Sequence, residues 1–201
     1  MAANWTKFWG SYERIEIDLC ELSHYIEFDD AHLGVYSGRL RDLLLRIGAE
    51  TENAARAVCD DLGINHGNLR NMPAVGQALA AQTKLAGATV DVTWPYQSFA
   101  TTTMTPLAAW TAGNNPAWFT SYNQVKHNRI QQGHNANVDA VVQGTAGLLV
   151  LNVLLRRPDI DGTNAHRGQI GSVIAAYSRF FDVSALLATT GATQVSLRVD
   201  L

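Results

Sequence analysis

Cysteine is scarce in this sequence: Cys20 and Cys59 are the only two among 201 residues. Neither lies at a spacing typical of a metal knuckle, and a disulfide framework would need more cysteines. Both fall in stretches with a helical pattern. We therefore predict two buried, free thiols in a protein of a reducing compartment.

Long apolar runs are also missing. The most apolar run, 141–155, contains Gln143 and Asn152 and ends at two arginines, so it is shorter than the roughly 20 residues that cross a bilayer. The first residues, MAANWTKFWGSYER, place aromatic and charged side chains where a signal peptide has its apolar core. We expect a cytoplasmic protein without membrane contact, in which 141–155 is a buried core helix.

An excess of charge of one sign is absent too. The chain has 15 Lys and Arg against 18 Asp and Glu, a formal net charge of -3. The surface as a whole is therefore not basic enough to attract nucleic acid, and binding of a polyanion would need a local basic cluster. The 47% of hydrophobic residues is enough for a core without disulfides or metal, and the length favours one domain over residues 1–201.

Helical periodicity dominates what the sequence does contain. Apolar residues recur at spacings of three and four, and they predict helices at about 11–26, 35–62, 71–85, 116–133 and 138–155. Ser37 and Asn71 suit the caps of two of these helices, and Gly63 marks the end of one. Proline at position 116, preceded by two asparagines, is a strong helix opening.

A Thr-rich stretch, 87–115, interrupts the helical pattern. Residues 89–93 alternate as in a short strand, and 98–104 could pair with them as a small hairpin. Pro106 suits the start of a short helix through Trp110. The tail predicts a helical segment over 169–181 and a strand over 194–201. The expected fold class is all-α, a bundle of about five helices with a small β-hairpin excursion.

The helix after Pro116 carries a dense polar and aromatic cluster. At 100° per residue, Trp118, Tyr122 and Arg129 fall on one narrow face. Asn123 and His127 are four apart, so their side chains lie one turn from each other. Three potential cations occur within four residues: Lys126, His127 and Arg129.

Such a cluster suits phosphate chemistry. A cation beside a histidine can lower the imidazole pKa and stabilise the charge that develops on a phosphorane, and aromatic rings can stack a base. A plain amphipathic helix has the same pattern, with Trp118 and Tyr122 inward and the polar residues outward. In that alternative His127 hydrogen-bonds a carboxylate such as Glu50 or Glu52.

The remaining polar and glycine-containing segments do not predict a second functional site. His24, Asp29, Asp30 and His32 crowd one turn but lack a recognised ligand spacing, so we expect a solvated turn, no metal site and no cofactor. Gly144 and Gly147 lack the lysine and the preceding strand of a phosphate loop, and they are typical of close helix packing. The aromatic residues of the N-terminal segment suit a lid on the core or a dimer contact.

The segment 118–129, WFTSYNQVKHNR, resembles a bacterial group with the signature W-x-x-Y-N-x-V-K-H-x-R. The stretches Tyr25-Ile-Glu27-Phe28 and Tyr36-Ser37, followed by a Leu-rich helix, also resemble that group. The group is similar to the HEPN (higher eukaryotes and prokaryotes nucleotide-binding) superfamily, and the resemblance covers about residues 10–155. It implies a helical bundle, a homodimer and, in many members, a metal-independent endoribonuclease of toxin–antitoxin or phage-defence systems.

The resemblance also implies roles for single residues. Asn123 matches the polar position and His127 the histidine of active members, whereas Tyr122 stands where those members have an arginine. Lys126 or Arg129 would then replace that arginine. In a ribonuclease His127 would move the proton, while Lys126, Arg129 and Asn123 would hold phosphate oxygens. Trp118 and Tyr122 are the expected binding residues.

Because Tyr122 stands where active members have an arginine, two further classes of function remain open. One is a catalytically silent module that binds nucleic acid or nucleotide, which the acidic net charge and the missing arginine favour. The other is a protein-interaction module. Exposure of His127 in a basic groove favours the first two classes, and a packed His127 favours the third.

Overall fold

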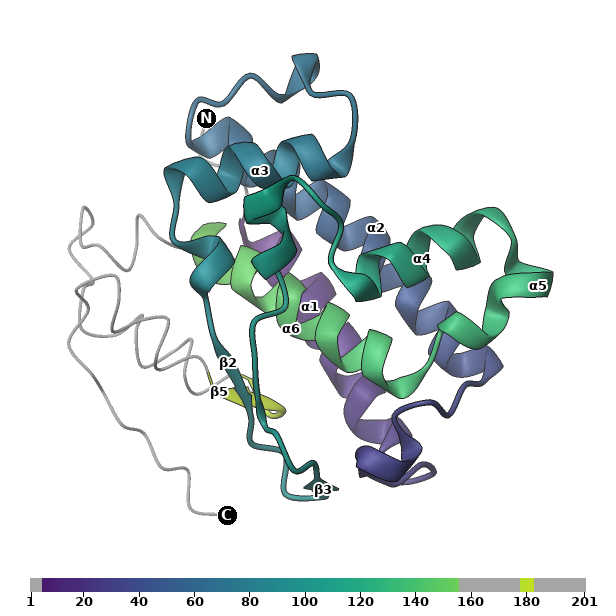
Figure 1. Cartoon of the computed structure of the whole chain (residues 1–201). Helices are drawn as coiled ribbons and strands as arrows, with labels where there is room; N and C mark the ends of the chain where they lie inside the picture. The colour runs from purple at the N-terminus through teal and green to yellow at the C-terminus, as the bar shows by residue number, and fades with distance from the viewer. Residues whose placement is uncertain (1–4, 156–177, 183–201) are drawn as a thin grey trace.

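The computed structural model describes residues 5–155 and 178–182 (Figure 1). Helices account for most of this part of the chain, which confirms the predicted mostly α-helical bundle. The α-helices are α1 (Trp5–Leu22), α2 (Gly38–Asp61), α3 (Met72–Gln82), α4 (Ala117–His127), α5 (Arg129–Gln132) and α6 (Val138–Leu155). Short 3-10 helices are η1 (Asp30–His32), η2 (His66–Asn68), η3 (Leu85–Gly87), η4 (Ala108–Ala112) and η5 (Gly133–Asn135).

The apolar helix α6 forms the centre of the bundle. It packs against α1, α2 and α4 (Figure 1). The helix is long and apolar enough to cross a membrane, but 83% of it is buried inside the protein. A helix that is apolar on all sides is buried by its neighbours, so the prediction of a core helix is confirmed.

Two glycines let α4 approach α6 closely. A Cβ atom on Gly144 would lie 2.9 Å from the Trp118 ring, and one on Gly147 would lie 3.0 Å from it. The indole of Trp118 therefore occupies the space that a larger side chain would fill. This confirms that the two glycines serve helix packing.

Polar caps begin α2 and α3 where the sequence predicts them. Ser37 accepts a hydrogen bond from the Leu40 amide at the start of α2, and Asn71 accepts one from the Ala74 amide at the start of α3. Gly63, just after α2, has a φ of 70°, a left-handed conformation that favours glycine. α1 differs, because it begins at Trp5 and ends at Leu22. α4 differs too, because Pro116 is the residue before the helix and no side chain caps its start.

The helix predicted over 116–133 is broken at Asn128. This residue has φ -143° and ψ 67°, and its side chain accepts a hydrogen bond from the Gln131 amide to cap α5. Asparagine competes with the helical backbone in this way. The prediction that Arg129 continues the face of Trp118 and Tyr122 is therefore wrong, because Arg129 begins a separate short helix.

The β structure is small and only partly as predicted. β2 (Val90–Val92) pairs antiparallel with β4 (Thr103–Met104), which confirms the pairing of these two stretches. Ser98 does not join it: β3 (Gln97–Ser98) pairs parallel with β1 (Phe28–Asp29). The sequence analysis missed β5 (Phe181–Asp182), which pairs antiparallel with β2 on the side away from β4.

A buried carboxylate on α1 holds the segment that contains β5. Glu16 is 2% exposed, and its Oε1 accepts hydrogen bonds from the Tyr12 hydroxyl, the Ser178 hydroxyl and the Phe180 amide. Burial, together with the charge of Glu16, raises the pKa of Tyr12 well above its ordinary value. The predicted helix over 169–181 is wrong for residues 178–181, which are not helical. The rest of that predicted helix and the predicted strand over 194–201 lie outside the described residues.

Both cysteines are buried and free, as predicted. Burial raises the pKa of Cys20 to about 12 and that of Cys59 to about 11. Thiols with such pKa values are weak nucleophiles at neutral pH, because the thiolate is the reactive form. Neither thiol is a candidate for the functional site.

Candidate functional site

The two aromatic residues of the α4 cluster belong to the core. Trp118 is 3% exposed and Tyr122 is 2% exposed. The Trp118 Nε1 donates a hydrogen bond of 2.9 Å to the Pro106 carbonyl, while the Tyr122 ring lies directly against Gly48 of α2. Their ring faces are covered by protein, so stacking on a ligand is not available to them here.

Glu52 of α2 binds two residues of α4 through one oxygen. Its Oε1 accepts hydrogen bonds of 3.1 Å from the Tyr122 hydroxyl and 3.1 Å from the Lys126 Nζ. Burial raises the pKa of Tyr122, and the hydrogen bond to the Tyr122 hydroxyl raises the pKa of Lys126. Lys126 is thus a cation whose charge is largely balanced by Glu52, rather than a free phosphate ligand.

Asn123 and His127 remain on the accessible side of α4. Asn123 is half-buried, and His127 is exposed at the last residue of the helix. Among the described residues neither side chain has a hydrogen-bond partner. The alternative in which His127 hydrogen-bonds Glu50 or Glu52 is not found, because Glu52 is engaged by Tyr122 and Lys126 and Glu50 lies on the α1 side of α2.

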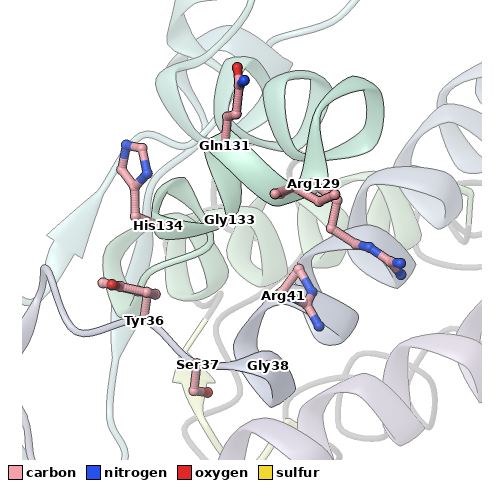
Figure 2. Close-up of a pocket in the computed structure, with 9 residues that line it drawn as sticks. Tyr36, Ser37, Gly38, Arg41, Arg129, Gln131, Gly133 and His134 are labelled. Carbon is pink, nitrogen blue, oxygen red and sulfur yellow. The ribbon is translucent and has the colours of Figure 1, made fainter.

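Arg129 lies in a groove of about 500 Å³ between two chain segments (Figure 2). One wall is the start of α2 and the residues before it; the other is α5 and η5. The groove is lined by Tyr36, Ser37, Gly38, Arg41, Arg129, Ile130, Gln131, Gly133 and His134. Its volume falls within the ~300–1,000 Å³ range typical of ligand sites.

Backbone hydrogen bonds hold the two walls together. The Val138 amide donates to the Val35 carbonyl at 3.0 Å, and the Asp139 amide donates to the Leu33 carbonyl at 3.1 Å. Tyr36 and Asn137 form an isolated antiparallel bridge. The groove is therefore a fixed feature of the fold, because its two walls are joined where they meet.

Two arginines from different helices supply the charge of the groove. Arg41 is about one third exposed; its Nε is 3.7 Å from an Asp42 carboxylate oxygen and makes no hydrogen bond. Arg129 is exposed, and within the described part of the chain it has no carboxylate at ion-pair distance. Figure 2 shows both guanidinium groups on one side of the groove and the rings of Tyr36 and His134 on the other.

Three groove residues were missed by the sequence analysis as site residues: Tyr36, Arg41 and His134. One signal points to Arg41. The first turn of α2 contains no acidic residue, although the positive end of the helix dipole favours carboxylates and disfavours cations there. A basic residue at such a position is unusual, and here its guanidinium lies on the same side of the groove as that of Arg129 (Figure 2).

The polar turn after α1 serves the structure. Asp29 accepts hydrogen bonds from the backbone amide of His32 and from its ring Nδ1, and the hydrogen bond from the His32 ring lowers the pKa of Asp29. Asp30 accepts from the Ala100 amide. In the part of the chain that the structure describes, no three metal-ligating side chains come together.

The residues of the α4 signature thus divide into two groups. Trp118, Tyr122 and Lys126 join α4 to the core and to Glu52, whereas Asn123, His127 and Arg129 stay accessible. Only Arg129 lines the groove. Comparisons with protein-family models, with curated proteins and with solved structures found no match for this chain.

Proposed function

We propose that this chain is an RNA-binding helical domain of the HEPN-like kind, and that the groove between α2 and α5 receives the RNA backbone. One observation carries the proposal: Arg41 and Arg129, from separate helices, converge on one open groove in a chain whose net charge is -3. A local basic site of this kind is what an acidic protein needs to bind a polyanion.

Arginine suits this role better than lysine. Its planar guanidinium forms paired hydrogen bonds with phosphate oxygens, and it is charged at any physiological pH. Two such groups side by side can contact successive phosphates of a flexible strand. The resemblance of segment 118–129 to the HEPN-like group supports RNA or a nucleotide as the ligand and a homodimer as the assembly. The two free, buried cysteines suit a reducing compartment such as the cytoplasm.

The double variant Arg41→Gln, Arg129→Gln is expected to bind a labelled single-stranded RNA at least about tenfold more weakly. Since each phosphate contact on a single strand contributes about 0.7 to the salt slope, the slope of log K against log salt falls by about 1.4. Fluorescence anisotropy over a salt series measures both quantities.

The matched control is Arg56→Gln, Arg70→Gln, which removes the same charge from two exposed positions. Arg56 lies 15 residues after Arg41 on α2, or about 22 Å along the helix. Equal losses in the two double variants would mean that net charge, and not the groove, governs binding. Absence of RNA binding by the unsubstituted protein would reject the proposal outright.

A metal-independent endoribonuclease is the second candidate, and the exposure of His127 favours it. His127 is two residues from Arg129, so their backbones lie within about 7 Å. In such a reaction the RNA 2′-oxygen attacks the adjacent phosphorus and the bond to the 5′-oxygen breaks, leaving a 2′,3′-cyclic phosphate and a 5′-hydroxyl. His127 moves the proton while Arg129 and Asn123 hold phosphate oxygens; Lys126 would take part only if its pair with Glu52 opened.

His127→Ala is expected to lower RNA cleavage in the presence of EDTA by about 100-fold or more, the usual contribution of a general acid or base. RNA affinity is expected to stay within about twofold, because the arginines remain. His24→Ala, at another exposed histidine, controls for loss of any imidazole. Cleavage at the same rate in the His127 variant would reject His127 as the catalytic residue, and no cleavage by the unsubstituted protein would leave the domain as a binding module only.

A further inference from the structure

Tyr36 places an exposed aromatic ring in the basic groove. Its side chain is 61% exposed, and its backbone lies where the two walls of the groove are joined by the bridge to Asn137. The ring meets the His134 ring edge-on, with 6.4 Å between centroids and an angle of 75°. Tyr36 therefore has a defined position before any ligand arrives.

The exposed face of Tyr36 has no role in the fold. The large aromatic side chains of the core, such as Trp110 and Phe119, are 0% and 1% exposed, because aromatic burial supplies much of the packing energy. Tyr36 forgoes that burial and lines the same groove as two arginines. A groove with an aromatic ring on one side and guanidinium groups on the other offers a surface for a planar apolar group and a separate site for the anion attached to it.

We propose that Tyr36 stacks an unpaired base of the nucleic acid whose phosphates contact Arg41 and Arg129, and that the groove therefore selects single strands. This inference rests on the proposed function. The geometry accounts for both parts of a nucleotide, since the rings lie on one side of the groove and the guanidinium groups on the other (Figure 2). In a duplex the base faces are covered by neighbouring base pairs, so a protein ring cannot reach them.

Base stacking on an aromatic ring depends little on sequence, because every base has a π face. The site is accordingly expected to prefer unpaired nucleotides without reading their order. His134 acts as a positioning residue that supports the Tyr36 ring from its edge. The exposed side chain of Ile130, which also lines the groove, adds an apolar contact at the opposite wall.

The test compares three probes of similar charge: a single-stranded oligouridine, an RNA duplex and inorganic polyphosphate, which has no bases. Tyr36→Ala is expected to weaken oligouridine binding by about tenfold, a typical loss for one stacked base. Polyphosphate binding stays within twofold, because the arginines are unchanged. Tyr36→Phe keeps the ring and is expected to retain oligouridine affinity.

Tyr25→Ala is the matched control, because Tyr25 is 74% exposed and does not line the groove. Equal losses for oligouridine and polyphosphate in Tyr36→Ala would overturn the inference, as would duplex binding as tight as that of the single strand. RNA binding that requires Arg41 and Arg129 but not Tyr36 would also overturn it, while leaving the proposed function standing. No binding of any probe by the unsubstituted protein would reject both.

Discussion

Replacing Gly48 by alanine is expected to lower the free energy of unfolding by about 1 kcal/mol, the overpacking cost less the helix-propensity gain, although alanine is the better helix former. A Cβ atom at this position would lie 2.3 Å from the ring of Tyr122, far inside a normal contact. Overpacking of a core costs about 1–3 kcal/mol, whereas glycine to alanine in an open helix gains about 0.5–1 kcal/mol. The sign of the change therefore reports whether the Tyr122 ring occupies this place.

Gly10 of α1 provides the matched control. The nearest atom to a Cβ at Gly10 is the far end of the Arg14 side chain at 3.7 Å, so Gly10→Ala is expected to stabilise the protein. Gly76→Ala repeats the first case at another site, because its Cβ would lie 2.2 Å from the ring of Trp110. Urea unfolding followed by circular dichroism measures all three. A Gly48 variant as stable as the Gly10 variant would show that α2 and α4 do not pack as described.

Removing the buried carboxylate of α1 is the second large effect. Glu16→Ala is expected to cost about 3 kcal/mol, because it leaves the Tyr12 hydroxyl, the Ser178 hydroxyl and the Phe180 amide without their acceptor. Each buried polar group that loses its partner costs about 1–3 kcal/mol, and the bonds to a carboxylate are stronger than neutral ones. Glu16→Gln, which keeps an acceptor oxygen, is expected to lose less.

Two measurements separate this effect from general weakening. Amide exchange at Thr93, which donates to the Phe180 carbonyl at 2.9 Å, is expected to speed up more than exchange in α6. Glu21→Ala removes a carboxylate from the same helix, but its ion pair with Arg39 is exposed, so stability is expected to change little. If Thr93 exchange is unchanged in Glu16→Ala, the carboxylate does not hold β5.

Local signals in the sequence account for the main helices. Ser37 and Asn71 cap helices because their side-chain oxygens reach backbone amides three residues later, a contact that needs no other part of the fold. The apolar character of 138–155 in the same way marks α6 as the centre of the core. Such features depend on neighbouring residues, so periodicity and cap residues predict them well.

The α4 cluster was predicted less completely. Periodicity places Trp118 and Tyr122 on one face, and the structure buries both. Periodicity could not show that Asn128 leaves the helix to cap α5, because asparagine can lie inside a helix or cap one. Nor could it choose the partner of Glu52, since two side chains 70 or more residues apart meet only when α2 and α4 pack.

The sequence by itself determined a helical bundle around one apolar helix and the caps of α2 and α3, because each follows from spacings within a single segment. Only the tertiary structure decided where the accessible cations and rings meet. Tyr36 and Arg41 come from the start of α2 and the residues before it, and Arg129 and His134 from the segment after α4. Their encounter depends on backbone hydrogen bonds that join residues about a hundred positions apart, and no local pattern encodes such contacts.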